Sequence, residues 1–333
     1  MKTFTGYETE APSLATAATS MAEIGGLKAA PLGSVPAVAD SQRLPVFIRV
    51  FRLEDWGKAV PVTIPQLSGV YEDLTVRIDL QLKARTVLFV QIAAPGLIPL
   101  NVSVPAAGRL ISTKCTLRVQ FAMGEIAVRV EFESVSANAC ARLLELGDYE
   151  RARQLATQDI PKDTSALTKF GQQFTQRLND PTATLLSRYI RLRVGDLDWS
   201  NNLAFSLADV FDWMSDGAII SGELAARKGL HQQALTLLLR ASDLSRHAPP
   251  LFTEGYKLLV SRLQQYSRPT GRLSTISEED AAKAQAFLDK LDAYTPYLEV
   301  DPITVAFSGA DLSNLEESQH PADLTGDDWF RWP

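Results

Sequence analysis

Apolar and polar residues alternate with a period of two through much of the chain between residues 46 and 132. In an extended strand, successive side chains point to opposite faces, so this pattern places one row in a core and the other in water. Two further segments are more uniformly apolar, which is typical of central strands buried on both faces. The alternating segments are 74–82, 98–104, 115–121 and 126–132, and the uniformly apolar ones are 46–53 and 86–92.

Short segments rich in glycine, proline and alanine separate these strands, and such residues favour turns. Strands that follow one another at intervals of about ten residues, with no helical pattern between them, indicate an antiparallel β-sandwich or barrel. The sequence therefore predicts an antiparallel β domain over residues 45–134.

The period of the apolar positions changes to that of an α-helix at Ser136. Ser136 is expected to cap a helix that ends at Gly147, and Gly195 and Gly229 are expected to end later helices. We therefore expect an α-helical, repeat-like domain over residues 135–300. The expected helices are 136–146, 149–158, 164–178, 182–194, 199–214, 217–228, 231–244, 250–266 and 277–291.

The two ends of the chain have a different composition. Residues 1–44 are rich in Ala, Ser, Thr, Pro and Gly, and this composition predicts a disordered arm. Residues 301–333 are polar and acidic without a clear period, until aromatic residues reappear at the end. We interpret this segment as an acidic, aromatic tail.

Composition and charge exclude some classes of partner. The net charge is −6, and Arg188, Arg191 and Arg193 form the densest basic cluster, which we expect to be a solvated helix face. Nucleic-acid binding needs clustered Lys and Arg, so no nucleic-acid partner is expected. The most apolar stretch, 87–104, is broken by Pro95, so it does not predict a membrane helix.

The two cysteines, Cys115 and Cys140, lie in apolar surroundings and are expected to be free, buried thiols. Residues 1–10 lack the charged and then apolar layout of a signal peptide. Both observations favour a cytoplasmic location, and no membrane partner is expected.

A repeated layout of glycine and alanine occurs in the helical region. Gly147 is followed five residues later by Ala152, and Gly229 is followed five residues later by Ala234. Gly195 precedes Gly229 by 34 residues. With this spacing, residues 136–266 resemble tetratricopeptide repeats, a family of stacked helical hairpins with that period. The resemblance implies that the alanine is small because the two helices of a hairpin cross there.

Two shorter stretches, 213–220 and 250–256, together with the order of β and then helical segments, suggest a second resemblance. They are similar to the accessory regions of multidomain bacterial caspase-like peptidases. The resemblance implies a bacterial protein without the peptidase domain that is a companion of such a peptidase or of a defence system.

The sequence contains no recognisable catalytic or cofactor-binding constellation. The histidines, His231, His247 and His320, lack metal-ligand spacing, and no phosphate-binding glycine loop occurs. We therefore expect no enzyme activity, no catalytic residues, no cofactor and no metal.

These observations predict a protein-interaction module or adaptor that binds a peptide or protein partner through its helical stack. The C-terminal Trp329, Phe330, Arg331 and Trp332 are the candidate partner-binding residues, because aromatic residues and arginine are common in binding hot spots. The same tail could instead fold back and cap the helical stack. A structural subunit of a larger assembly, or an enzyme with an unrecognised site, are the alternative functions.

Overall fold

A computed structural model describes eleven segments of the protein, all of which belong to the compact unit Leu44–Pro333. The predicted arm 1–44 and the predicted helix 164–178 lie outside these segments. The described residues are 45–55, 58–62, 67–72, 75–82, 87–104, 113–122, 125–158, 180–196, 204–269, 276–309 and 330–332.

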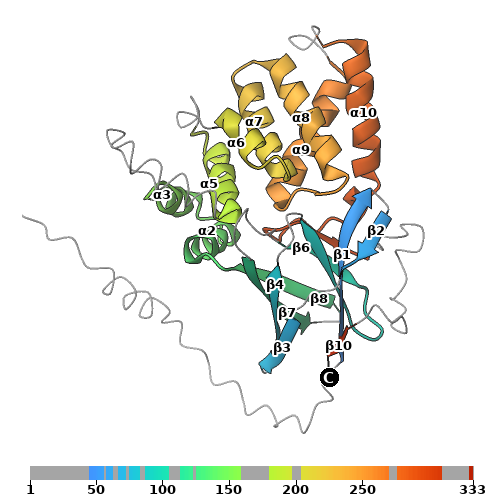
Figure 1. Cartoon of the computed structure of the whole chain (residues 1–333). Coiled ribbons are helices and arrows are strands. Elements are labelled where there is room, and N and C mark those ends of the chain that lie inside the picture. Colours follow the sequence, from blue (N-terminus) through green and yellow to red (C-terminus); the bar gives the residue numbers. More distant parts are fainter. Residues whose placement is uncertain are drawn as a thin grey trace, which may run out of the picture. The chain divides into compact units, whose positions relative to one another are not determined.

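Two antiparallel sheets form the β part of the protein (Figure 1). The first sheet has the order β10-β1-β5-β6-β9, with β2 also paired to β1, and the second has the order β3-β4-β7-β8. Within the described residues, neither sheet closes into a barrel. The strands of the first sheet are β1 (Val46–Asp55), β2 (Lys58–Pro61), β5 (Leu88–Ala93), β6 (Leu100–Val104), β9 (Ala306–Ser308) and β10 (Phe330–Trp332). Those of the second sheet are β3 (Leu67–Glu72), β4 (Thr75–Leu82), β7 (Thr113–Ala122) and β8 (Glu125–Phe132).

The predicted alternation is visible in the burial of the strands. On β4 and β7, every second residue is buried, and these residues form one hydrophobic cluster with residues of β1 and β5 in the other sheet. Burying apolar surface in this way stabilises the fold by about 25 cal/mol per Å². The buried members of this cluster are Val46, Ile48, Val50, Val76, Ile78, Leu80, Leu88, Val90, Ile92, Val104, Cys115, Leu117 and Val119.

The central strands β5 and β6 of the first sheet are buried on both faces. All six residues of β5 are buried, and Phe89 faces the larger hydrophobic cluster that the helices share. Phe89 packs there against Phe307, with ring centroids 5.9 Å apart. The prediction of a central strand within residues 86–92 is therefore confirmed.

Helices follow β8 directly, and the change from strand to helix lies between Phe132 and Val135, where the sequence predicts it. The helix cap is Ser134 and not Ser136, because the Ser134 hydroxyl accepts a hydrogen bond from Ala137 N at 3.2 Å. The helices are α2 (Val135–Glu145), α3 (Tyr149–Gln158), α5 (Pro181–Arg193), α6 (Ala204–Val210), α7 (Ser215–Arg227), α8 (His231–Ser245), α9 (Thr253–Ser267) and α10 (Glu278–Asp292), with a 3₁₀ turn η3 (Thr295–Tyr297).

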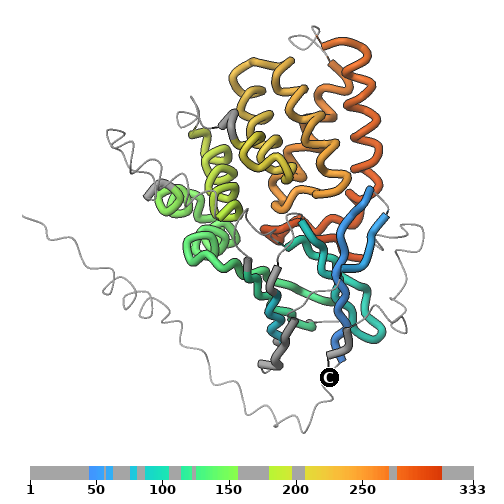
Figure 2. The backbone as a smooth tube through the Cα atoms, in the orientation of Figure 1, coloured from blue at the N-terminus to red at the C-terminus, as the bar shows by residue number. Residues whose placement is uncertain are grey.

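Helices α7 and α8 form a tightly packed pair, which Figure 2 shows side by side. A Cβ atom at Gly222 would lie 2.9 Å from Leu238 Cγ and 3.3 Å from the carbonyl oxygen of Ala234. Ala234 is fully buried, and Gly229 supplies the turn between the helices with a φ of 78°. Ala234 of the predicted repeat layout therefore lies where α7 and α8 approach closely, opposite Gly222, and Gly229 lies in the turn between them.

Several features differ from the predictions. Strands β2, β3, β9 and β10 were not predicted, and β9 lies within the segment 301–333 that was interpreted as a tail. Arg188 and Arg191 are 4% and 7% exposed, so the prediction that they form a solvated face is wrong. Helix α5 is buried on nearly all sides, which leaves its long side chains inside the protein.

Candidate functional site

A groove of about 910 Å³ opens between the second sheet and the helices. One wall is formed by β7 and β8, and the other by α2, α5 and the first turn of α9. The segment 299–303 and the residues Ile98 and Leu100 complete the lining. Small-molecule sites usually have volumes of roughly 300–1,000 Å³, so this groove lies near the upper end of that range.

Part of the inner lining of the groove consists of apolar side chains that are packed into the core. Leu186 and Ile190 of α5 are buried in the helical core, and Phe252 packs edge-on against Tyr189 with ring centroids 5.6 Å apart. At the opening, Ile98 and Val300 are 51% and 59% exposed. The groove therefore offers exposed apolar contacts above a buried apolar floor.

Charged residues surround this floor, and most of the basic ones already have a carboxylate partner. Ion pairs join Arg129 to Glu145 at 3.2 Å, Arg193 to Glu254 at 2.7 Å and Arg118 to Glu131 at 2.6 Å.

Three carboxylates of the groove, those of Glu125, Glu299 and Asp301, make no ion pair with any residue that the structure describes. Lys257 is bound to a backbone oxygen, because its Nζ donates to Val300 O at 3.0 Å. The unpaired charges of the groove are therefore those of three carboxylates and one ammonium, so their sum is negative.

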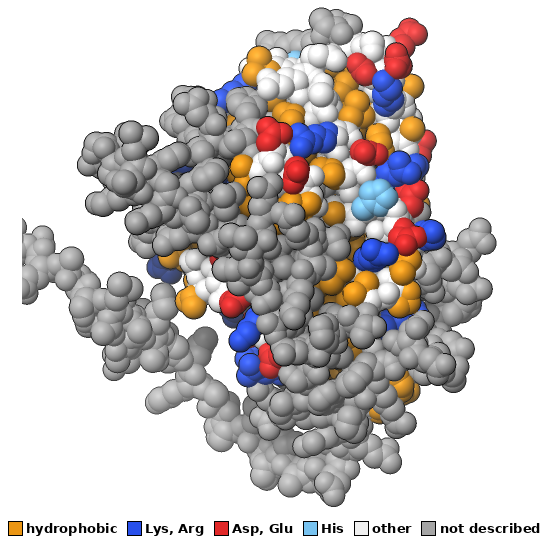
Figure 3. All heavy atoms as spheres, viewed as in Figure 1, with side chains coloured by type: hydrophobic (Ala, Val, Ile, Leu, Met, Phe, Trp, Pro, Cys, Tyr) orange, Lys and Arg blue, Asp and Glu red, His pale blue; other side chains and the backbone are white. Residues whose placement is uncertain are grey.

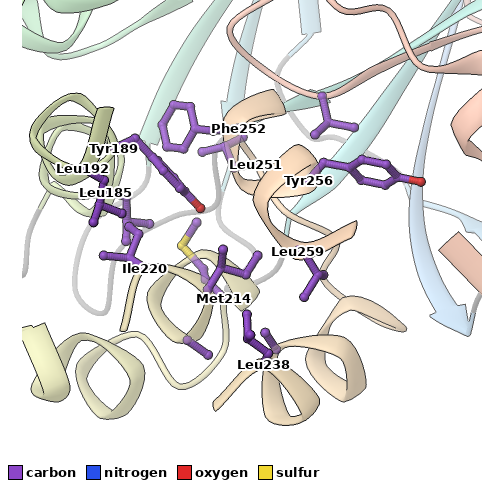
Figure 4. Packing of buried hydrophobic residues seen from close by; sticks show 14 of the residues in the cluster. Leu185, Tyr189, Leu192, Met214, Ile220, Leu238, Leu251, Phe252, Tyr256 and Leu259 are labelled. Atoms are coloured by element: carbon purple, nitrogen blue, oxygen red, sulfur yellow. The ribbon is translucent and has the colours of Figure 1, made fainter. Parts of the chain in front are cut away.

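The stretches 213–220 and 250–256 meet beside the groove, at the carboxylate of Asp216. This residue lies in the first turn of α7, and its side chain is fully buried. It accepts hydrogen bonds from Leu251 N at 2.8 Å, Tyr189 Oη at 2.9 Å and Phe252 N at 3.4 Å. Figure 4 shows Tyr189, Leu251 and Phe252 converging between α5 and α9. The carboxylate therefore fixes the segment that leads into α9.

The packing around Asp216 leaves no room for larger side chains. A Cβ atom at Gly255 would lie 2.3 Å from Tyr189 Oη and 3.1 Å from Asp216 Oδ1. Burial raises the pKa of Asp216 to about 6, although the hydrogen bonds from Leu251, Tyr189 and Phe252 oppose the shift. With three donors and no exposure, this carboxylate has a structural role.

The same segment is also bound to the first sheet. Leu251 O accepts from Val305 N at 2.9 Å and from Ser103 Oγ at 3.0 Å, and Thr253 N donates to Ile303 O at 3.0 Å. Helix α7 and the edge of the sheet therefore hold the start of α9 from two sides. Because Phe252 and Thr253 line the groove, these contacts set the shape of its floor.

The predicted partner-binding residues lie elsewhere. Phe330, Arg331 and Trp332 form β10, which pairs antiparallel with the first residues of β1: Ile48 opposes Phe330 and Val46 opposes Trp332. Their side chains, and all of Trp329, lie outside the described part of the chain. The structure thus brings the backbone of the tail to the sheet, and a role in binding a partner stays a prediction.

The two cysteines are free and buried. Burial, together with the nearby Asp79 and Glu131, raises the pKa of the Cys115 thiol, so this thiol stays protonated. Within the described segments, no group of His, Cys, Asp and Glu side chains could hold a metal ion. No helix in the same segments is long and apolar enough to cross a membrane.

Acidic and basic side chains lie intermixed over the helices on the face shown in Figure 3.

The chain belongs to a family whose model matches more than half of its length. The model of a family described as the Y4kD C-terminal domain matches residues 139–325. No curated protein and no solved structure matches the chain.

Proposed function

We propose that the region matched by the family model, residues 139–325, serves to bind a partner through the groove of which it forms one wall. The protein is then a non-enzymatic interaction module or adaptor, and its ligand is a peptide segment of another protein. The groove between the helices and the second sheet is the binding site.

The groove itself is the observation that supports this proposal. It is large enough for a peptide, it has a buried apolar floor, and exposed apolar side chains stand at its opening. Exposed apolar residues around a cavity often mark a binding site for a protein or peptide. The sequence suggested binding through the helical stack as a whole. We place the binding surface on the side of α5 and α9 that faces β8.

An enzyme with an unrecognised site has less support. Asp216 has a strongly raised pKa, which is typical of catalytic carboxylates, but it is fully buried and bound by three donors. A structural subunit of a larger assembly stays a second candidate, and light scattering of the purified protein distinguishes it by a stable oligomer.

The architecture that we propose for this module is a β-sandwich followed by a tetratricopeptide-like helical stack. A hydrophobic cluster shared by both sheets supports the sandwich. The close approach of Gly222 to Leu238 and Ala234 supports the helical hairpin, and the contacts between α9 and α10 support a second one. Two free, buried cysteines favour a reducing compartment, and we propose the cytoplasm. The resemblance to caspase-associated regions makes a bacterial caspase-like peptidase the first partner to test by co-expression.

The groove is tested with a library of random decapeptides displayed on phage and selected on the wild-type protein. The affinities of the selected peptides are then measured by fluorescence polarisation for Ile98→Gln and Val300→Gln. Losing one apolar contact in the complex costs about 1.5–3 kcal/mol, so each variant should bind at least about tenfold more weakly.

Leu230→Gln is the matched control, because Leu230 is 46% exposed but lies in the turn between α7 and α8, away from the groove. This variant should bind with the affinity of the wild type. If the library yields no binding peptide, or if both groove variants bind as well as the control, the proposed function is wrong.

A further inference from the structure

The groove contains the free edge of a β-sheet. Strand β8 is the last strand of the order β3-β4-β7-β8, and the described part of the chain places no strand on its other side. The five consecutive residues 125–129 of β8 all line the groove. Because neighbouring side chains of a strand point to opposite faces, five consecutive lining residues mean that the backbone edge itself faces the groove.

The hydrogen bonds of Asn138 show which backbone groups point out of this edge. Phe132 N donates to Asn138 Oδ1 at 2.6 Å, and Asn138 Nδ2 donates to Phe132 O at 2.6 Å. The N–H and C=O of Phe132 therefore point away from β7, although the residue lies opposite Cys115 in the register. The backbone groups of alternate residues in an antiparallel strand point to the same side. Those of Ile126, Val128 and Val130 thus point away from β7 as well.

No residue in the described segments occupies these three positions. Ile126, Val128 and Val130 lie opposite residues of β7 in the register. Their outward backbone groups make no hydrogen bond to any described residue across the groove. The side-chain amide of Asn138 has the donor and acceptor of a peptide group, and it binds Phe132 as a neighbouring strand would. The Asn138 amide therefore takes the place of an added strand beside Phe132. The outward backbone groups of Val130, Val128 and Ile126 are left open for a ligand.

We propose that the outer edge of β8 pairs with an extended peptide that has alternating apolar residues and at least one lysine or arginine. The proposal rests on the function proposed above and specifies how the ligand is held. Backbone hydrogen bonds to Ile126, Val128 and Val130 supply affinity, and the groove walls select side chains, as in other cases of strand addition.

The charge of the groove determines the preference for a basic peptide. Arg118, Arg129 and Arg193 are each neutralised by a carboxylate, whereas Glu125, Glu299 and Asp301 have no cationic partner among the described residues. A cationic side chain in the ligand would neutralise one of these carboxylates, and an acidic side chain would be repelled by them.

A second copy of the chain is a less suitable occupant. Pairing two β8 strands edge to edge would bring a whole sheet between the walls formed by α2, α5 and the segment 299–303, whereas a peptide enters as a single extended chain. A dimer held by β8 is therefore one of the outcomes that the experiment must detect.

The experiment compares Val128→Pro with Val128→Ala, using synthetic versions of the decapeptides selected on the wild type. Proline removes the outward N–H of residue 128 without removing a bond to β7, and proline is tolerated on the solvent side of an edge strand. Alanine removes more of the side chain than proline does but keeps the N–H, so a greater loss for proline reports on the N–H. Fluorescence polarisation should show an affinity loss of at least about tenfold for the proline variant and less than about threefold for the alanine variant.

Two further measurements make the test independent of the folding of the proline variant. N-methylation of the alternate peptide residues whose N–H groups point toward β8 should abolish binding to the wild-type protein. Methylation of the intervening residues should leave the affinity unchanged. The triple variant Glu125→Gln, Glu299→Gln, Asp301→Asn should weaken the basic peptides and reduce their dependence on salt.

Each result supports or overturns the inference. Equal binding by folded Val128→Pro and Val128→Ala, or binding that does not depend on which residues are methylated, overturns strand pairing. If Ile98→Gln still weakens binding in that case, the proposed function remains. Selected peptides without basic residues overturn the charge argument. A wild-type dimer that Val128→Pro converts to a monomer overturns the peptide as occupant in favour of a second copy.

Discussion

The buried carboxylate of Asp216 gives a stability prediction with a distinctive dependence on pH. Replacing it with alanine leaves the buried donors Leu251 N–H and Tyr189 O–H, both within 3 Å of the carboxylate, without an acceptor. An unsatisfied buried donor costs about 1–3 kcal/mol, so the two together lower the free energy of unfolding by about 2–6 kcal/mol. The longer contact from Phe252 N, at 3.4 Å, adds little.

The ionisation of Asp216 makes this loss smaller at neutral pH. Its pKa is raised from 3.8 to about 6 in the folded protein. Between these values the folded state binds a proton that the unfolded state does not, so the stability contributed by this group is greatest at low pH and falls as the pH rises through 6. One pKa unit corresponds to about 1.36 kcal/mol, and the contribution at pH 4.5 exceeds that at pH 7 by about 2 kcal/mol.

Urea unfolding of the wild type and Asp216→Ala at pH 4.5 and pH 7 measures both effects. The difference in unfolding free energy should be about 2 kcal/mol larger at pH 4.5 than at pH 7. Asp212→Ala, at an exposed position four residues earlier, is the control and should change stability by less than about 0.5 kcal/mol. A difference that is the same at both pH values, or larger at pH 7, would refute the argument that burial dominates the pKa of Asp216.

Three further changes test other parts of the fold. Ala234→Leu should lower the free energy of unfolding by about 1–3 kcal/mol in thermal melting, because α7 and α8 are closest there, while the exposed Gln233→Leu should not. Glu223 is 2% exposed and bonded to Arg262; burial works to raise the pKa of this glutamate, but the arginine contacts lower it. Glu223→Gln should therefore destabilise the protein most above pH 4.5, by about 3–5 kcal/mol, and less as the pH falls, in urea unfolding measured across pH. Deleting 327–333 should lower the melting temperature by uncovering the edge of β1; unchanged melting with loss of a partner would instead identify the tail as an anchor for that partner.

The sequence predicts regular elements well where a periodic pattern extends over many residues. The alternation in 115–121 corresponds to β7, and the expected helix 277–291 corresponds to α10, which Ser277 caps by accepting a hydrogen bond from Asp280 N. Strand β9 has only three residues, Ala306–Ser308, which is too short for any period to appear. Its burial depends on β6 and the rings of Tyr256 and Tyr294, none of which is near it in sequence.

The groove could not be predicted, because its lining joins residues from 98 to 308 along the chain. A period of two identifies β8 as a strand but does not tell which strand lies beside it. The two hydrogen bonds of Asn138 are the signal that distinguishes the outward side, and they exist only once α2 has folded against the end of β8. In the same way, only the folded position of α5 explains why Arg188 is buried.

Some edge strands of the two sheets are covered by other segments, whereas the edge of β8 is not. This difference connects stability with function. Exposed strand edges promote aggregation, and proteins usually cover them. The edge of β1 is covered by β2 and β10, and the edge of β9 by a hydrogen bond from Glu299 N to Ala306 O at 2.8 Å. Strand β8 is longer than β2 or β10. The described residues nevertheless pair its outer edge only at Phe132. In the proposed mode of binding, the groove walls beside this edge favour a single extended chain over another sheet, so the edge would remain available for a ligand while aggregation through it is disfavoured.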